Sequence, residues 1–252
     1  MDKLMTACGV LCGIYHEDRD VPCQDSVCAQ QSENVSCVAL CDGAGSVKGA
    51  ERVSESAARA LAALFTERFD ALWALEDDVL RSLILSQGVE AVQKDAPGIP
   101  AACTLLLAAM HTDGRCLVCH LGDGAIIASG VDGTGRIFSV PENGRSASET
   151  YFLCGPNPMR HLRIYRTLPD WADALLLCSD GVSRQVYELD GTAAPVVRKM
   201  VGWLRSDGEA FAARLIDDAL RNVFRRLSRD DLSIAILLHK TLTEPEEGET
   251  TI

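Results

Sequence analysis

The sequence predicts an α+β fold, a four-layer α/β/β/α sandwich in which two mainly antiparallel sheets are flanked by pairs of helices. Two observations lead to this prediction. Short apolar or alternating runs, which are typical of strands, occur in groups along the chain. Two of these groups are each followed by two segments with helical periodicity. Chains that group their elements in this way form antiparallel sheets with helices outside them, whereas alternating elements favour parallel βαβ units.

The first group contains three predicted strands and is followed by two predicted helices. The strands are bounded by polar turns and cover 4–13, 26–31 and 35–41. Within 49–69, apolar residues recur at helical spacing: Val53, Ala57, Ala60, Leu61 and Leu64. A second helical stretch covers 76–94 and ends before Pro97 and Pro100, because proline disfavours helix continuation.

Strand-like runs then return, and a second pair of helices precedes the last strand. The predicted strands are 103–110, 116–121, 125–129, 135–140, 161–168 and 174–178. Asp113-Gly114 and Asp132-Gly133 each separate two such runs, as expected of hairpin turns. The helices cover 194–204 and 209–227, and the last strand covers 232–238. Two sheets between two helix pairs use every one of these elements.

The composition indicates one sizeable domain with an acidic surface. Hydrophobic residues make up 47% of the chain and charged residues 24%, which is ample for a core. We expect a single domain at 1–240, because no segment there has the composition of a linker. The tail at 241–252 is glutamate-rich and aperiodic, so we expect it to be disordered. The formal net charge of −12 argues against a nucleic-acid partner.

The sequence also predicts a cytoplasmic monomer that does not bind membranes. The first residues lack the basic-then-apolar order of a signal peptide, and no apolar run approaches the roughly 20 residues of a membrane span. The 11 cysteines are expected to be reduced, since most lie in apolar runs. Cys116-Leu-Val-Cys119-His120 matches a haem-attachment pattern, but residues three apart in a strand point to opposite faces. We therefore reject both haem and zinc at this pattern.

Three apolar runs end in Asp-Gly, at Asp42, Asp123 and Asp180. A fourth carboxylate has the opposite polarity, because Asp230 opens the apolar run that begins at Leu232. If these strands are neighbours, their aspartates converge at one edge of the sheets. Clustered carboxylates are tolerated when cations neutralise them, so the pattern predicts a site for divalent cations.

Five motifs follow one another along the chain: His16 with Pro22-Cys23-Gln24-Asp25, Asp42-Gly43-Ala44-Gly45-Ser46, Leu121-Gly122-Asp123-Gly124, Ser179-Asp180-Gly181-Val182 and Arg229-Asp230-Asp231-Leu232-Ser233. In this order they resemble the motifs of the metal-dependent PP2C-like protein phosphatases, and are similar to those of the bacterial branch. The resemblance covers roughly residues 9 to 238. It implies a central β-sandwich flanked by helices, in agreement with the order of elements.

The resemblance also implies roles for individual residues. Asp42 corresponds to the carboxylate that bridges two Mn²⁺ or Mg²⁺ ions, and the Gly43 carbonyl to a further ligand of one ion. Asp180 and Asp230 correspond to the remaining direct ligands of the other ion. Asp25 corresponds to the aspartate that holds metal-bound water, and Asp123 to the ligand of a third, weaker site. Asp231 stands where the family usually has Asn.

Two departures from the family pattern concern the substrate. The family's arginine that grips the substrate phosphate has no clean equivalent, and both His16 and Arg19 are candidates. The Ser-Arg that commonly follows the third motif is replaced by Gly124-Ala125. The aperiodic segment 141–159 falls where the family has a variable flap, and is expected either to shape substrate choice or to be a plain surface connection.

The leading interpretation is a phosphatase that hydrolyses phosphoserine and phosphothreonine in proteins, through a bridging hydroxide on a two-metal centre. Its partners would be phosphoprotein substrates, and it would oppose a Ser/Thr kinase. Two alternatives remain open, a hydrolase of small phosphoesters and a catalytically silent module that binds a partner. Retention of Asp42, Asp180 and Asp230 favours an enzyme. His120 and His161 are candidate acids for the leaving group, although a lone strand histidine is more often a packed core residue.

Overall fold

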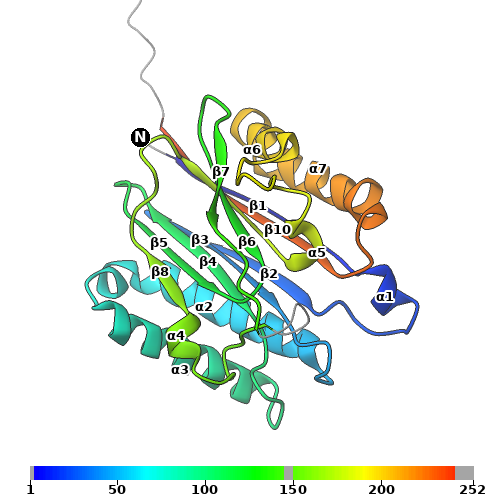
Figure 1. Cartoon of the computed structure of the whole chain (residues 1–252). Coiled ribbons are helices and arrows are strands. Elements are labelled where there is room, and N and C mark those ends of the chain that lie inside the picture. The colour runs from blue at the N-terminus through cyan, green and yellow to red at the C-terminus, as the bar shows by residue number, and fades with distance from the viewer. Residues whose placement is uncertain (1–2, 145–149, 242–252) are drawn as a thin grey trace, which may run out of the picture.

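The computed structural model describes residues 3–144 and 150–241 and consists of two five-stranded antiparallel sheets between helices (Figure 1). The first sheet has the order β1 (Lys3–Leu11), β10 (Leu232–Lys240), β9 (Ala174–Cys178), β6 (Ala125–Ser129) and β7 (Gly135–Ser139). The second has the order β2 (Asp25–Gln31), β3 (Val35–Asp42), β4 (Leu105–His111), β5 (Cys116–Leu121) and β8 (Arg163–Tyr165). Every neighbouring pair in these sheets is antiparallel. The predicted fold class is confirmed.

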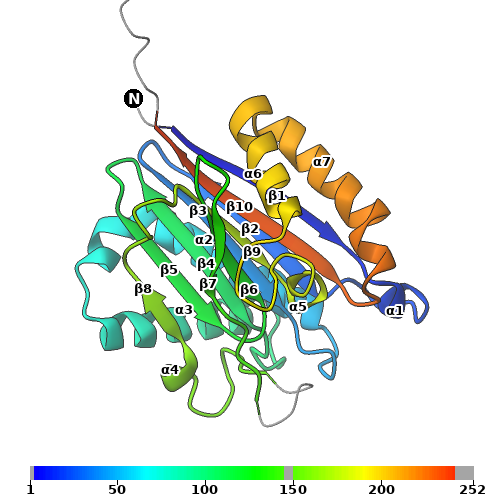
Figure 2. The same cartoon turned by 45° about the horizontal axis from the view of Figure 1, so that its top comes forward.

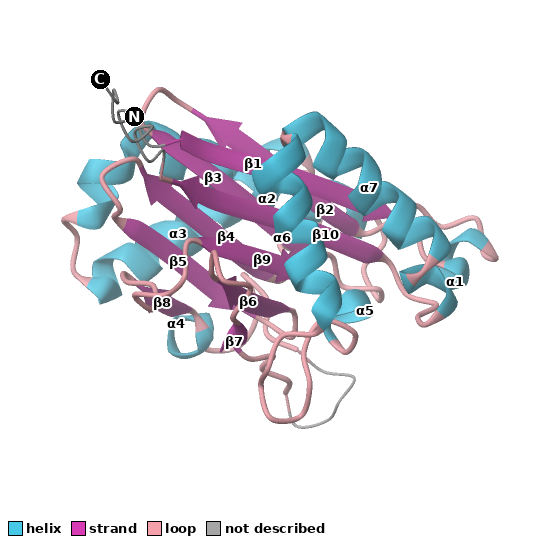
Figure 3. Cartoon of the chain, turned by 90° about the horizontal axis from the view of Figure 1, so that it is seen from above, coloured by secondary structure: helices cyan, strands magenta, loops and turns pink. Residues whose placement is uncertain are grey.

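Two helix pairs cover the outer faces of the sheets (Figures 1 and 3). The pair α2 (Ala50–Trp73) and α3 (Asp77–Asp95) covers the second sheet, where α2 packs on β2, β3 and β4. The pair α6 (Pro195–Asp207) and α7 (Glu209–Asn222) covers the first sheet. No helix in the described part of the chain is both long and apolar enough to cross a membrane.

Three apolar layers hold the sandwich together and explain why its strands are apolar throughout. In β3, Cys37 and Ala39 pack toward α2, whereas Val38 and Leu40 pack toward the other sheet. A central strand is therefore buried on both faces, and its sequence is apolar from Cys37 to Cys41. Alanines on the buried face of α2, which include Ala57 and Ala62, let the helix approach the sheet closely.

The hairpin and cysteine predictions agree with the structure. Residues 112–115 join β4 to β5, and 130–134 join β6 to β7. Cys116 packs between the sheets, whereas Cys119 packs toward the helices, so their sulfurs lie on opposite faces of β5. All 11 cysteines are free.

Several boundaries differ from the prediction. The strand expected at 161–168 is limited to Arg163–Tyr165, because a short helix, α4 (Pro158–His161), precedes it. The helix expected to run to 227 ends at Asn222 and is followed by the 3₁₀ turn η1 (Phe224–Arg226). Two further short helices, α1 (Ile14–Glu17) and α5 (Asp180–Ser183), were not predicted, since four residues carry no periodicity. Most of the predicted acidic tail lies outside the described residues.

Candidate active site

The sheet topology brings the ends of several strands to one edge of the sandwich. Asp42 is the last residue of β3 and pairs with Asp25, the first residue of β2. In the other sheet, the end of β9 lies beside the starts of both β10 and β6. Asp180 follows β9, Asp230 precedes β10, and Asp123 lies where the chain crosses from β5 to β6. The convergence predicted from the sequence is therefore present in the structure.

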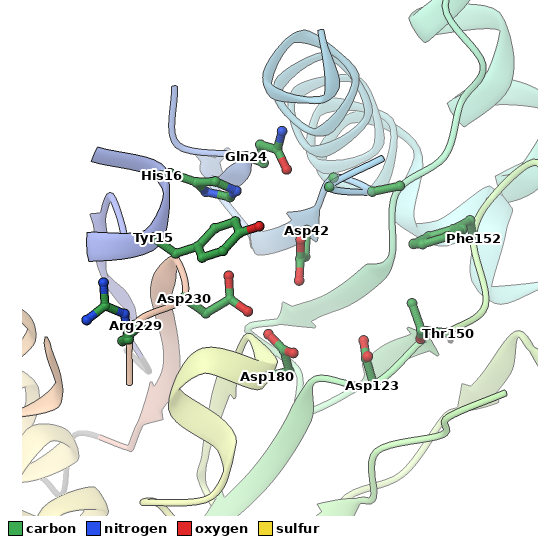
Figure 4. A pocket seen from close by; sticks show the side chains of 13 residues that line it. Tyr15, His16, Gln24, Asp42, Asp123, Thr150, Phe152, Asp180, Arg229 and Asp230 are labelled. Atoms are coloured by element: carbon green, nitrogen blue, oxygen red, sulfur yellow. The ribbon is translucent and has the colours of Figure 1, made fainter. Parts of the chain in front are cut away.

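These carboxylates line one cavity of about 500 Å³. Figure 4 shows Asp42, Asp123, Asp180 and Asp230 directed toward a common space. The other lining residues are Tyr15, His16, Gln24, Gly43, Ala44, Gly45, Thr150, Phe152 and Arg229. Four acids therefore concentrate negative charge at this edge of the sheets.

The carboxylates raise one another's pKa values. Burial raises the pKa of Asp42 well above its usual value, and the negative charges of neighbouring acids, with Asp25 first among them, add to the effect. Burial likewise raises the pKa of Asp25, although hydrogen bonds from Ser233 and Ser179 oppose the rise. Asp25 does not line the cavity; its Oδ2 accepts a hydrogen bond of 2.7 Å from the Ser233 hydroxyl.

The two carboxylates on the far side of the cavity behave in the same way. Burial, followed by the charges of Asp230 and Asp123, raises the pKa of Asp180 from 3.8 to about 7. Burial also raises the pKa of Asp123, and Asp230 adds to this rise while the Thr150 hydroxyl opposes it. Several acids with raised pKa values at one site are expected where no cation neutralises their carboxylates.

Close backbone packing fixes the turns that carry the acids. A Cβ atom added at Gly43 would lie 2.6 Å from the carbonyl oxygen of Ala50 at the start of α2. One added at Gly181 would lie 2.1 Å from the carbonyl oxygen of Asp231. Glycine after Asp42 and after Asp180 is therefore required by packing and not only by turn geometry.

Asp231, which replaces the family's Asn, is a buried acceptor and does not line the cavity. Its Oδ1 accepts the backbone N–H of Gly13 at 2.7 Å, and its Oδ2 accepts the backbone N–H of Gln24 at 2.6 Å. The same Oδ2 lies 2.9 Å from Nδ1 of His16. Three partners thus account for the charge of Asp231 and fasten both ends of the entry segment to the start of β10.

The two phosphate-binding candidates lie in different surroundings. His16 is buried and lines the cavity. Arg19 is not among the lining residues; its guanidinium lies over the Tyr15 ring, 3.7 Å from the centroid, and donates to the Tyr15 carbonyl. Arg229 does line the cavity and was not among the predicted phosphate-binding residues, although its position next to Asp230 could have indicated it.

The segment expected to act as a flap contributes two residues to the cavity, Thr150 and Phe152. Its residues Ser148 and Glu149 lie outside the described part of the chain. His161, at the end of this region, bonds to Glu142 through Nδ1 at 2.8 Å and does not line the cavity. His120 is fully buried and bonds to Ser139, so it is a packed core residue.

The donor set fits small divalent cations. No Lys, Arg or His in the described ranges forms an ion pair with Asp42, Asp123, Asp180 or Asp230. Those ranges also contain no group of three or more His, Cys, Asp or Glu side chains already gathered as ligands of one ion. Mg²⁺ and Mn²⁺ need no such group, because they prefer oxygen, take one or two carboxylates and keep several waters. Unpaired carboxylates and the Gly43 carbonyl supply oxygen donors of this kind.

The comparison with protein families assigns the chain. A family model described as Protein phosphatase 2C matches residues 12–224, which is most of the 252-residue chain. The chain therefore belongs to the protein phosphatase 2C family, as the motifs indicated. Phosphatases of this family depend on Mg²⁺ or Mn²⁺. No curated protein sequence matches the chain significantly.

Solved structures with the same fold include several phosphatases. A bacterial serine phosphatase aligns with a TM-score of 0.67 at 16% identity, over 96% of this chain and 100% of the other. The photosystem II phosphatase PBCP aligns with a TM-score of 0.63 at 10% identity, over 95% and 100%. RsbX, solved in complex with magnesium, aligns with a TM-score of 0.55 at 14% identity, also over 95% and 100%. At these identities the likeness shows a shared fold.

Proposed function

We propose that this chain is a Mn²⁺- or Mg²⁺-dependent phosphatase that hydrolyses phosphoserine and phosphothreonine in proteins. The observation that carries the proposal is the group of four carboxylates at one cavity without a cationic partner in the described chain. Family membership supports the same reaction class. The retained acids favour an enzyme over a silent binding module, because a module has no need of a cluster of unpaired carboxylates.

In this proposal different acids bind different ions of a two-metal centre. Asp42 would contact both ions, Gly43 would offer its carbonyl to one of them, and Asp180 and Asp230 would hold the other. The bound ions would activate a water for in-line attack on phosphorus and screen the phosphoryl oxygens. Asp123 would hold a third ion more weakly, as the resemblance implies.

The buried acid Asp25 would contact metal-bound water and would not bind an ion directly. It lies beside Asp42 in the sheet and is held by Ser233, so its orientation is fixed by packing. From there it would orient the waters that complete the coordination of the ions. This is the place that the resemblance implies for it.

Phosphate binding would fall to groups at the opposite wall of the cavity. His16 has its Nδ1 occupied by Asp231, so Nε2 is the ring nitrogen left for a substrate oxygen. Arg229 also lines the cavity, but its guanidinium pairs with Asp18 at 2.8 Å, so His16 is the better-placed group. Arg19 would act indirectly, through the Tyr15 ring that it covers.

Turnover of p-nitrophenyl phosphate with Mn²⁺, with Mg²⁺ and with EDTA tests the proposal. We expect turnover that requires the ion, followed by turnover of phosphoserine and phosphothreonine peptides in preference to phosphotyrosine peptides. Asp42→Asn is the inactive control, and Asp113→Asn, in the β4–β5 hairpin, is the matched acid that should remain active. Absence of metal-stimulated turnover of all these substrates would favour the partner-binding module.

A further inference from the structure

A second cavity, of about 510 Å³, lies next to the active site and is rich in arginine. Its lining residues are Ile14, Arg221, Arg225, Arg226, Leu227, Ser228 and Arg229. Four arginines at one cavity are unusual in a chain whose net charge is −12. Figure 2 shows the region, where the end of α7 meets α1.

The fold gathers these arginines by a tight turn between α7 and β10. Arg221 lies in the last turn of α7, and Arg225 and Arg226 lie in η1. Phe224, between them, is buried in the core that α6 and α7 form with their sheet. Because this ring anchors the turn, the flanking arginines remain at the surface.

Two of the four arginines are already paired and two are not. Arg225 forms an ion pair with Glu17, and Arg229 with Asp18 at 2.8 Å. Both acids belong to the segment that begins with α1, so the chain itself places carboxylates beside this cavity. Arg221 and Arg226 are exposed and form no ion pair within the described residues, which leaves two positive charges free for a ligand.

The arginine cavity is continuous with the active site through Arg229, which lines both. The next residue, Asp230, belongs to the carboxylate group of the active site. A peptide whose phosphorylated residue reaches Asp42 and Asp230 would therefore pass a neighbouring side chain along the arginines. The position suits a group only a few residues away in the substrate.

We propose that the arginine cavity binds an anionic side chain of the protein substrate, a carboxylate or a second phosphate, close to the residue that is dephosphorylated. The inference rests on the proposed function and adds a substrate class to it: phosphoproteins with acidic or multiply phosphorylated sites. The planar guanidinium donates two parallel hydrogen bonds to a carboxylate or phosphate, so Arg221 and Arg226 suit such a ligand. A cavity of about 510 Å³ has room for side chains of a peptide that also occupies the active site.

A set of three phosphothreonine peptides tests the proposal, with two flanking residues that are glutamate, glutamine or phosphoserine. Each exposed ion pair between an arginine and a glutamate is expected to raise kcat/KM about 3-fold. Two such pairs predict about 10-fold higher kcat/KM for the glutamate peptide than for the glutamine peptide. The double variant R221Q/R226Q should reduce this ratio to about 2-fold or less. R214Q, which changes an exposed arginine of α7 that does not line the cavity, should keep the ratio. Because both peptides are hydrolysed at the same catalytic centre, a change in that centre would alter both kcat/KM values and leave their ratio unchanged.

The phosphoserine peptide and salt separate the sources of the effect. A larger preference for phosphoserine than for glutamate would assign the cavity to multiply phosphorylated sites. Raising salt from about 0.1 M to about 1 M shortens the Debye length from about 10 Å to about 3 Å and should reduce the wild-type ratio. A wild-type ratio near one, or a ratio that survives in R221Q/R226Q, would overturn the proposal.

A binding measurement keeps the test independent of catalysis. The arginine Nε–H signals of the ¹⁵N-labelled protein would be followed by NMR in EDTA while the glutamate peptide without phosphate is added. We expect shifts of the Arg221 and Arg226 signals, assigned by their loss in R221Q and R226Q, and no shift of the Arg214 signal. No turnover of p-nitrophenyl phosphate by the wild type would refute the proposed function, whereas absence of these shifts would refute the arginine cavity.

Discussion

Asp180→Asn is expected to stabilise the metal-free protein while weakening its response to metal. Burial and the charges of Asp230 and Asp123 raise the pKa of Asp180 from 3.8 to about 7. The folded protein therefore binds this proton more tightly than the unfolded chain, so the free energy of unfolding falls as pH rises from about 4 to about 7. Above about pH 7 the whole penalty is present. Asparagine keeps the shape of the side chain and removes the charge.

The size of the effect follows from the pKa and from solvent exposure. A rise from 3.8 to about 7 corresponds to about 4 kcal/mol, at about 1.36 kcal/mol for each pKa unit. Asp180 is nevertheless exposed to solvent in the open cavity, and water screens its repulsion by the other acids. We therefore expect about 1–2 kcal/mol of stabilisation at pH 8. For a protein of this length, that is an increase in Tm of about 4 °C.

Thermal unfolding in EDTA at pH 4, 6 and 8 measures this prediction. The variant should match the wild type at pH 4 and exceed it at pH 8. In Mn²⁺ the order should reverse, since an ion at 100 times its Kd stabilises the wild type by about 2.7 kcal/mol and the variant less. Asp190→Asn is the control, because Asp190 accepts the Thr192 N–H and its pKa is lowered. A variant that is less stable than the wild type in EDTA at pH 8 would refute the electrostatic argument.

Three further predictions concern turnover. Asp42→Asn should lower kcat at least about 100-fold while the protein still folds, and near-normal activity at saturating Mn²⁺ would exclude a bridging role. His16→Ala should raise the KM for p-nitrophenyl phosphate about 10-fold, whereas Arg19→Ala, which changes a residue outside the cavity, should raise it less. If both variants had the kinetics of the wild type, neither residue would bind the substrate phosphate. Asp123→Asn should shift the Mn²⁺ dependence of turnover to higher Mn²⁺ concentration, and Asp113→Asn should not. If turnover by the two variants depended on Mn²⁺ in the same way, Asp123 would be a turn residue and not a metal ligand.

The layers of the fold could be predicted because each carries a repeating pattern along the chain. Central strands such as β3 are buried on both faces and are apolar over most of their length, and the buried residues of α2 recur at helical spacing. The short helices α1 and α5 carry no such pattern. Close contacts between distant segments fix the turns beside them: a Cβ at Gly13 would lie 2.2 Å from the Asp230 carbonyl carbon, and Gly181 packs on Asp231. Contacts between residues so far apart in sequence leave no local signal.

The acids of the candidate site could be predicted because each marks the end of an apolar run. The groups that complete the cavity could not, since Tyr15, Thr150 and Phe152 lie in segments without periodicity. Their positions depend on how the entry segment and the region after β7 pack over the sheet edge. Arg229 could be predicted in part. Its position next to Asp230 indicated that it lies close to the site, but the orientation of its side chain depends on the turn that follows α7.

Two residues that differ from the family pattern, His16 and Asp231, contact each other in the structure. Asp231 replaces the family's Asn, and His16 is a candidate for the place of its arginine; the two side chains bond to each other at 2.9 Å. Asp231 also accepts two backbone N–H groups, so three N–H donors meet two carboxylate oxygens. Asparagine would turn an NH₂ group toward one of these donors and leave a buried N–H unmatched, at a cost of about 1–3 kcal/mol. The carboxylate therefore matches the histidine and the backbone around it, and an exchange of either residue alone would break the arrangement that positions the entry segment.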